Sequence, residues 1–214
     1  AKKTYDESAI KTLSPLEHIR KRTGMYIGRT GNGSDYNDGI YVLLKEVLDN
    51  AIDEFISGYG KSVNIKIENN LVTIRDYGRG IPLGKVIDCV SQINTGGKFN
   101  DDVFQFSVGM NGVGTKAVNA LSTYFKVRST RDGEFFEAIF KEGVLQSQNK
   151  GTSTERNGTL VEFTPDDTIF KNYKFQEEHI ERRIRLSSYL NAGLSINYNG
   201  TTFRSEEGLL DLLN

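Results

Sequence analysis

Three tight-turn sequences constrain the fold of this chain most strongly, because each separates two short segments whose apolar residues alternate. The turns and their flanking segments are Asn69-Asn70 between 62–68 and 71–76, Asp132-Gly133 between 123–130 and 134–141, and Asn199-Gly200 within 194–204. Turn residues between alternating segments are typical of β-hairpins, in which neighbouring strands run antiparallel. With a further strand predicted at 158–164, the chain is expected to form a mostly antiparallel sheet.

Helices are predicted in four segments, at 38–57, 83–94, 115–121 and 176–191. In the first of them, apolar residues recur at positions i, i+3, i+4 and i+7, and Gly58 marks its end. The polar segment 147–157 is interpreted as a loop. Because helices and strands occur in blocks and do not alternate strictly, the predicted fold class is α+β, a two-layer sandwich whose sheet is covered on one face by helices.

Composition excludes several classes of protein. The 27 basic and 28 acidic residues give a formal charge of −1, which argues against the positive surface of a dedicated duplex-DNA binder. No apolar run approaches the roughly 20 residues of a membrane span, and no signal segment is visible.

The single cysteine, Cys89, lies in an apolar segment, so we expect a small buried thiol and a cytoplasmic protein. The chain lacks an initial Met and ends within an apolar pattern, so a fragment of a longer protein is expected.

One face of the predicted helix 38–57 is polar. At about 100° per residue, Glu46, Asn50 and Asp53 fall within an arc of about 60° on the side opposite the leucines. Such a face can simply be solvated. An amide oxygen beside carboxylates is also the hard-oxygen set that suits Mg²⁺, which keeps several waters and takes few protein ligands.

Glycines crowd the middle of the chain. Asp76 precedes the first of them in the sequence DYGRGIP over 76–82, and a second glycine-rich stretch covers 96–114, where a Gly-Val-Gly turn opens a helix. Either stretch could be an ordinary turn or a flexible loop. Amides exposed at a helix start and glycines that allow close approach also suit a phosphate, although neither the Walker nor the Rossmann spacing is present.

In combination and in this order, the three motifs resemble the ATP-binding motifs of the gyrase, Hsp90, histidine kinase and MutL superfamily. Within it, four segments resemble the ATPase subunits of bacterial type II topoisomerases, the group of gyrase B and the topoisomerase IV protein ParE. These segments are 19–28 (IRKRTGMYIG), 46–54 (EVLDNAIDE), 78–82 (GRGIP) and 96–99 (GGKF). The resemblance runs from about Tyr5 to the end of the chain and implies the Bergerat-type ATP-binding fold.

The resemblance implies a role for each matched residue. Glu46 is expected to be the general base that orients and deprotonates the attacking water, and Asn50 to be the Mg²⁺ ligand that bridges the phosphates. Asp76 is expected to accept the adenine amino group, with Thr159 close by and sharing a buried water. The other residues expected to bind ATP are Val47, Asp53, Arg79, Gly80, Ile81, Pro82, Ile93, Lys98, Met110, Asn111, Gly112, Val113, Gly114, Thr115 and Tyr5.

These further residues fall into groups. The apolar ones would wall the adenine, whereas Lys98 and the amides over 110–115 would hold the β- and γ-phosphates. Arg79 would pair with Glu54 at the rim of the pocket. That pair could equally be a plain surface ion pair, which contributes little.

The resemblance also implies how the chain is organised and what it assembles with. Residues 1–14 resemble a dimerisation arm that carries Tyr5 to the partner's nucleotide, and 15–214 the ATP-binding domain. The implied assembly is a homodimer that closes as a gate when ATP is bound, with a DNA-cleaving subunit of the gyrase A or ParC type, duplex DNA and no membrane. Without the transducer domain that follows in such subunits, we expect ATP binding with little turnover.

Two other ATP-using classes remain open. An ATP-driven clamp of the MutL or Hsp90 type would lack topoisomerase activity, and a histidine kinase would pass the phosphoryl group to a protein histidine. Segment 19–28 disfavours the first, and the settings of His18 and His179 disfavour the second. Gyrase and topoisomerase IV are not distinguished, although the short connector between Pro82 and Gly96 favours ParE.

Four positions depart from the pattern of the topoisomerase subunits. Thr23 stands where many members have proline, Tyr77 where many have an acid, Asn111 where many have histidine, and Glu137 where gyrases often have arginine. Asn111 keeps a hydrogen-bond donor but cannot gain a charge by protonation. Glu137 puts in doubt the contacts that coumarin-type inhibitors make at the pocket mouth.

Overall fold

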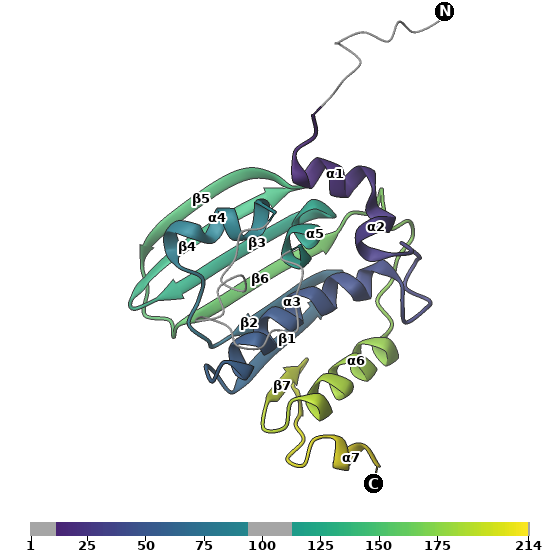
Figure 1. Cartoon of the computed structure of the whole chain (residues 1–214), viewed down its shortest axis with the longest axis vertical. Coiled ribbons are helices and arrows are strands. Elements are labelled where there is room, and N and C mark those ends of the chain that lie inside the picture. The colour runs from purple at the N-terminus through teal and green to yellow at the C-terminus, as the bar shows by residue number, and fades with distance from the viewer. Residues whose placement is uncertain (1–11, 94–112, 214) are drawn as a thin grey trace, which may run out of the picture.

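The computed structural model describes residues 12–93 and 113–213 of the chain. Their strands form one eight-stranded sheet in the order β5-β4-β3-β6-β2-β1-β7-β8 (Figure 1). The strands are β1 Ser62–Glu68, β2 Leu71–Asp76, β3 Ser122–Arg131, β4 Glu134–Lys141, β5 Val144–Thr152, β6 Gly158–Pro165, β7 Ser195–Tyr198 and β8 Thr201–Phe203. Among these strands only β1 and β7 pair in parallel, which confirms the predicted, mostly antiparallel sheet.

Each predicted hairpin turn has the backbone that its residues favour. Both turn residues have positive φ in all three: 49° and 66° at Asn69 and Asn70, 51° and 85° at Asp132 and Gly133, and 44° and 91° at Asn199 and Gly200. Two consecutive positive φ angles are the geometry of the type I′ turn, whose twist matches that of the strands it joins. The turn residues therefore explain the pairing of β1 with β2, of β3 with β4 and of β7 with β8.

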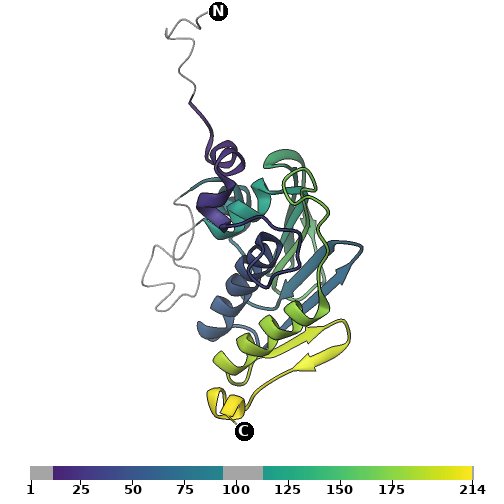
Figure 2. The same cartoon turned by 90° about the vertical axis from the view of Figure 1, so that its right-hand side faces the viewer.

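The helices gather on one face of the sheet, as Figure 2 shows in an edge-on view. They are α1 Pro15–Lys21, α2 Thr23–Ile27, α3 Gly39–Ile56, α4 Val86–Ser91, α5 Gly114–Ala120, α6 Glu177–Leu190 and α7 Leu209–Leu213. The predicted helices at 38–57, 115–121 and 176–191 are confirmed as α3, α5 and α6. The predicted helix at 83–94 is shorter, because α4 follows a 3₁₀ turn, Leu83–Lys85, and ends at Ser91.

The core lies between the helices and the inner face of the sheet. Alternate residues of the central strands are buried there, such as Ile65 in β1, Ile74 in β2 and Val127 in β3, and they belong to one cluster with the leucines of α3. The intervening residues of these strands face away from the helices. Since no described helix covers that outer face (Figure 2), the fold is the predicted two-layer α+β sandwich.

The prediction of a loop at 147–157 is wrong for its first part. Residues 144–152 form β5, which pairs antiparallel with β4 along its length. Glu142 and Gly143, with φ of 52° and 82°, make the turn between the two strands. All nine residues of β5 are exposed because it is an edge strand. Its polar sequence therefore shows no apolar alternation, and backbone pairing rather than side-chain burial determines its structure.

Two smaller expectations can be compared with the structure. Cys89 on α4 is half-buried rather than fully buried, and burial raises the pKa of its thiol. Among the described helices, none is long and apolar enough to cross a membrane.

Candidate functional site

The polar side of α3 does not face solvent freely. Asp53 is fully buried, and Glu46 and Asn50 are half-buried. Thus a merely solvated face is the wrong interpretation of these residues. In the sandwich, α3 lies against α5 as well as against the sheet, so its polar residues meet the beginning of α5.

Gly114, the first residue of α5, lies directly against Glu46. A Cβ atom at position 114 would overlap Oε2 of Glu46, so only glycine fits there without moving the carboxylate. In the next position, Thr115 accepts a hydrogen bond through its Oγ1 from Nδ2 of Asn50, at 2.5 Å. Nδ2 of Asn50 also lies 3.0 Å from the backbone oxygen of Glu46, one turn earlier in α3. An acid and an amide from α3 thus converge on the first two residues of α5.

The same contacts orient the amide group of Asn50. Because both acceptors lie on its nitrogen side, the amide oxygen lies on the opposite side. Among the described residues, no group of three or more His, Cys, Asp or Glu side chains could hold a metal ion by themselves. Mg²⁺ commonly takes only one or two protein oxygens and completes its coordination with water and phosphate. The donors present therefore fit a phosphate-bound Mg²⁺ better than a metal held by protein alone.

A second polar group lies where β2 ends. Oδ1 of Asp76 accepts hydrogen bonds from the backbone N–H groups of Gly78, at 2.9 Å, and Thr159, at 3.2 Å. None of the described residues donates to Oδ2. The side chain is 8% exposed, and burial raises the pKa of its carboxyl group to about 6, although the two backbone hydrogen bonds oppose this rise. Near neutral pH, Asp76 is thus a carboxylate with one oxygen available to accept a hydrogen bond from a ligand.

Thr159 lies next to Asp76, as the sequence predicts. Its backbone N–H donates a hydrogen bond to Oδ1 of Asp76, and a water shared by the two residues stays a prediction. Gly158, with φ of 142°, makes this approach possible, because a Cβ atom there would overlap the backbone oxygen of Asp76.

The predicted pair of Arg79 and Glu54 is present and is more than a plain surface ion pair. Nη2 of Arg79 donates to Oε1 of Glu54 at 2.8 Å, and Nε donates to Oε2 at 3.1 Å. The backbone N–H of Arg79 also donates to Oε2, at 2.7 Å. The side chains are only 24% and 15% exposed, and the guanidinium lies 4.3 Å from the centre of the Tyr59 ring. This bidentate pair connects the end of α3 to the loop after β2.

The loop after Arg79 is tied to β3. Gly80 has φ of +76°, and a Cβ atom on it would lie 2.8 Å from the backbone oxygen of Thr130. Ser129 donates from Oγ to the backbone oxygen of Ile81 at 2.6 Å, and Arg131 donates to that of Gly80 at 3.3 Å. Sequence analysis missed Ser129 and Arg131. No local pattern marks them, because their partners lie about fifty residues earlier in the chain.

The remaining predicted site residues are distributed around these groups. Val47 is buried in α3, Ile81 is half-buried against the core, and Pro82 is exposed before the 3₁₀ turn. Ile93 ends the first described segment, and Val113 immediately precedes α5. The predicted residues that lie outside the described part of the chain are Tyr5, Lys98, Met110, Asn111 and Gly112.

Two of the departures from the topoisomerase pattern lie on the outer face of the sheet. Glu137 pairs with Lys126 and with Arg128, each at 3.4 Å. The hydroxyl of Tyr77 accepts a hydrogen bond from Asn64 at 2.9 Å. Both side chains therefore have partners within the protein.

The sequence of this chain is similar to those of known proteins. A family model described as "Histidine kinase-, DNA gyrase B-, and HSP90-like ATPase" matches residues 35–169. The B subunit of DNA topoisomerase 4 from Borreliella burgdorferi is 63% identical over 210 residues, which are 98% of this chain and 35% of that protein. The B subunit of DNA gyrase from Mycobacterium tuberculosis strain H37Ra is 36% identical over 215 residues, 97% of this chain and 31% of that protein. The chain thus spans about a third of the length of these relatives.

A solved structure has the same fold. The 43K ATPase domain of Thermus thermophilus gyrase B, crystallised with an aminocoumarin, superposes with a TM-score of 0.77 at 30% sequence identity. The match covers 94% of this chain and 54% of that chain. The fold that holds α3, β2 and α5 therefore has a counterpart in a solved structure.

Proposed function

The chain belongs to the family of histidine kinase-, DNA gyrase B- and HSP90-like ATPases, and on this premise we propose that it is the ATP-binding and ATP-hydrolysing part of a type II DNA topoisomerase. The observation that carries the proposal is the convergence of Glu46 and Asn50 on the first residues of α5. The kind of enzyme is proposed from the relatives, and the 63% identity to the B subunit of a DNA topoisomerase 4 favours topoisomerase IV over gyrase.

Adenine binds at the Asp76 end of the site. Oδ2 of Asp76 accepts a hydrogen bond from the adenine amino group, while Oδ1 stays bonded to the backbone of Gly78 and Thr159. The apolar walls are Val47, Ile81, Pro82 and Ile93. The ion pair of Arg79 with Glu54 forms the rim, and Gly80 and Asp53 complete this part of the site.

The phosphates lie between α3 and the start of α5. Glu46 would accept a proton from the attacking water as the γ-phosphoryl group passes to that water. Asn50 would be the protein ligand of a bound Mg²⁺, and the metal would supply positive charge to neutralise the phosphates. Lys98 and the backbone over Met110, Asn111, Gly112, Val113, Gly114 and Thr115 hold the β- and γ-phosphates. In this scheme Gly114 is glycine because any side chain would displace the base.

In the assembly, ATP closes a homodimeric gate. Residues 1–14 form the arm through which Tyr5 reaches the partner's nucleotide, and 15–214 form the ATP-binding domain. The gate works with a DNA-cleaving subunit of the gyrase A or ParC type on duplex DNA, and therefore in the cytoplasm.

Replacement of two helical glycines by alanine tests the phosphate site. Gly114→Ala places a methyl group against Glu46, whereas Gly24→Ala in α2 places it in open space. The added methyl group also lies at the start of α5, where the phosphates are proposed to bind, so we expect Gly114→Ala to weaken binding of a non-hydrolysable ATP analogue with Mg²⁺ by about tenfold or more. Calorimetric titration measures the affinities, and circular dichroism checks the fold. Equal affinities of the two variants would place the phosphates elsewhere.

A further inference from the structure

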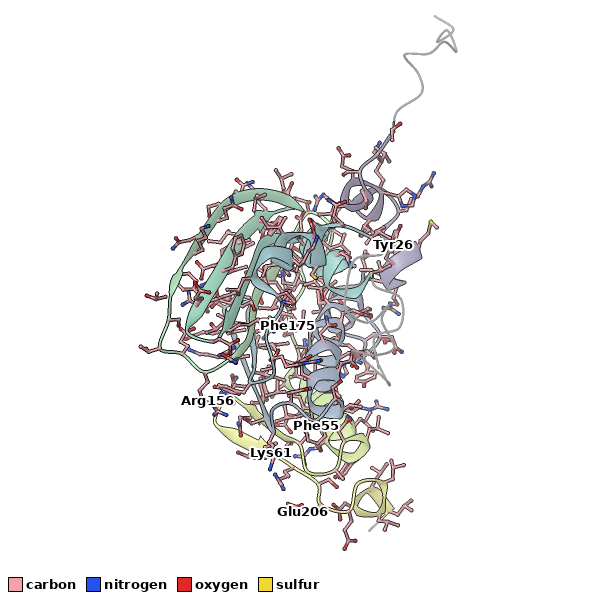
Figure 3. All side chains as sticks on the ribbon, turned by 60° about the vertical axis from the view of Figure 1, so that its left-hand side comes forward. Tyr26, Phe55, Lys61, Arg156, Phe175 and Glu206 are labelled. Carbon is pink, nitrogen blue, oxygen red and sulfur yellow. The ribbon has the colours of Figure 1, made fainter. Side chains whose placement is uncertain are left out.

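The outer face of the sheet carries a cleft that the nucleotide site does not use. It has a volume of about 360 Å³ and is lined by three arginines, Arg75, Arg128 and Arg156, together with Tyr77, Thr130, Glu155 and Leu160. Arg75 lies on β2 and Arg128 on β3, while Arg156 lies in the connection from β5 to β6. Figure 3 shows Arg156 projecting from the lower end of the sheet.

The cleft lies on the opposite side of the sheet from Asp76. Successive residues of a strand point to opposite faces, and Asp76 lies between Arg75 and Tyr77 in sequence. Asp76 is buried on the helix side, whereas its two neighbours line the cleft. A ligand of the cleft therefore does not occupy the place of adenine.

The three arginines differ in how their charges are balanced. Arg128 forms ion pairs with Glu155 at 3.1 Å and with Glu137 at 3.4 Å, and its guanidinium lies 3.8 Å from the centre of the Phe135 ring. Arg75 and Arg156 have no carboxylate within ion-pair distance among the described residues. Arg75 still interacts electrostatically with Glu155, so the cleft contains three arginine charges and one glutamate charge.

The guanidinium groups of Arg75 and Arg156 both lie near the ring of Tyr77. Arg75 lies 4.9 Å and Arg156 4.7 Å from the centre of the Tyr77 ring. Nη2 of Arg75 also donates a hydrogen bond to the backbone oxygen of Arg156, at 2.5 Å. Two positively charged side chains thus contact one aromatic ring, and Glu155 is the carboxylate that lines the same cleft. Guanidinium groups in such a position bind oxyanions through paired N–H donors.

The surroundings limit the size of the anion. Glu137, Glu155 and Glu162 lie around the arginines on the same face and would repel a long polyanion such as a nucleic acid. Leu160 and the Tyr77 ring add apolar surface. The volume is at the lower end of the roughly 300–1,000 Å³ found for small-molecule pockets.

We propose that this cleft binds a small molecule that carries one oxyanion group, a phosphate monoester or a carboxylate, on a flat apolar body. The guanidinium groups of Arg75 and Arg156 donate hydrogen bonds to the oxyanion, and the apolar body lies against Tyr77 and Leu160. The site is separate from the nucleotide site, so both are occupied at the same time.

Titration of the chain with phenyl phosphate tests the proposal, with and without saturating ADP. Binding is followed by calorimetry and by the NMR signals of the arginine Nε–H groups. We expect Arg75→Gln and Arg156→Gln each to weaken binding by about tenfold, because each removes one charged donor. The matched control is Arg182→Gln on α6, since Arg182 stacks on Tyr36 at 4.6 Å outside the cleft. Tyr77→Phe, which keeps the aromatic platform, should retain binding.

A parallel titration with benzoate distinguishes the two oxyanions. Tighter binding of phenyl phosphate assigns the site to phosphate monoesters, and similar affinities assign it to oxyanions in general. Arg156 is exposed, and its bond to Arg75 uses only its backbone, so Arg156→Gln keeps the fold and the test remains decisive if Arg75→Gln unfolds. Unchanged affinity in Arg156→Gln, no binding of either probe, or displacement of phenyl phosphate by ADP would overturn the proposal.

Discussion

Replacing Asp76 by asparagine should stabilise the folded chain while weakening its binding of ATP. Burial raises the pKa of Asp76 from 3.8 to about 6. A pKa raised by folding means that the folded state favours the protonated acid. The protonated Asp76 side chain therefore contributes fully to the free energy of unfolding below pH 3.8, and this contribution is lost as the pH rises to about 6. At about 1.4 kcal/mol per pH unit, the ionised carboxylate then costs the folded state about 3 kcal/mol.

Asparagine avoids this cost because it stays neutral at every pH. Its oxygen can still accept the hydrogen bonds from Gly78 and Thr159, so we expect the local backbone to keep its conformation. We therefore expect Asp76→Asn to be more stable than the wild type at pH 8 by up to about 3 kcal/mol. Between pH 5 and pH 8 the difference should grow by about 1–1.5 kcal/mol, with most of the change below pH 6.

Urea unfolding at a series of pH values measures this difference. Asp167→Asn is the matched control, because Asp167 is exposed in the loop after β6. Asp76→Asn should also bind ATP about 10–150-fold more weakly than the wild type, since it loses a charged acceptor. Parallel stability curves for Asp76→Asn and the wild type would show that burial does not penalise the carboxylate, and the reasoning would be refuted.

Three further substitutions test other parts of the site. Glu46→Gln in a longer subunit should leave ATP affinity within a few-fold and lower turnover by about 10²-fold or more, and equal loss of both would make Glu46 a structural or metal-binding residue. Thr115→Val removes the acceptor of the Asn50 amide, so Mg²⁺ should raise the affinity for ATP less in this variant than in the wild type. An unchanged effect of Mg²⁺ on ATP affinity would show that Asn50 is not a ligand of the metal. Glu54→Gln should lower the free energy of unfolding by about 1–3 kcal/mol, because Arg79 loses its charged partner, and an unaltered urea midpoint would contradict this.

The sequence predicted those parts of the fold that depend on local chemistry. Asn69-Asn70 and Asp132-Gly133 indicate hairpins because these residues tolerate positive φ wherever they occur. The edge strand β5 was missed because its pairing with β4 leaves no trace in its own polar sequence. Glu142-Gly143 was the available signal, since its two positive φ angles make the same kind of turn.

The sequence predicted which motifs form the site, but it did not predict the contacts between them. The polar face of α3 singles out Glu46 and Asn50, yet the bond from Asn50 to Thr115 spans 65 residues and depends on how α5 packs. Likewise, the pKa of Asp76 follows from burial, which its turn-like sequence does not reveal. The outer cleft was missed altogether, because the contact between Arg75 and Arg156 spans 81 residues.

The proposed ATP site requires Asp76 to accept a hydrogen bond from the adenine amino group of ATP. Comparison of ATP with inosine triphosphate tests this requirement most directly. Inosine triphosphate has a carbonyl oxygen in place of the amino group, so it would set an acceptor against the Asp76 carboxylate. We expect the wild-type chain to prefer ATP by about a hundredfold or more in calorimetric titrations with Mg²⁺, and Asp76→Asn to lose or reverse this preference because its amide can donate to the carbonyl. The same ratio of affinities in both proteins would show that adenine binds elsewhere.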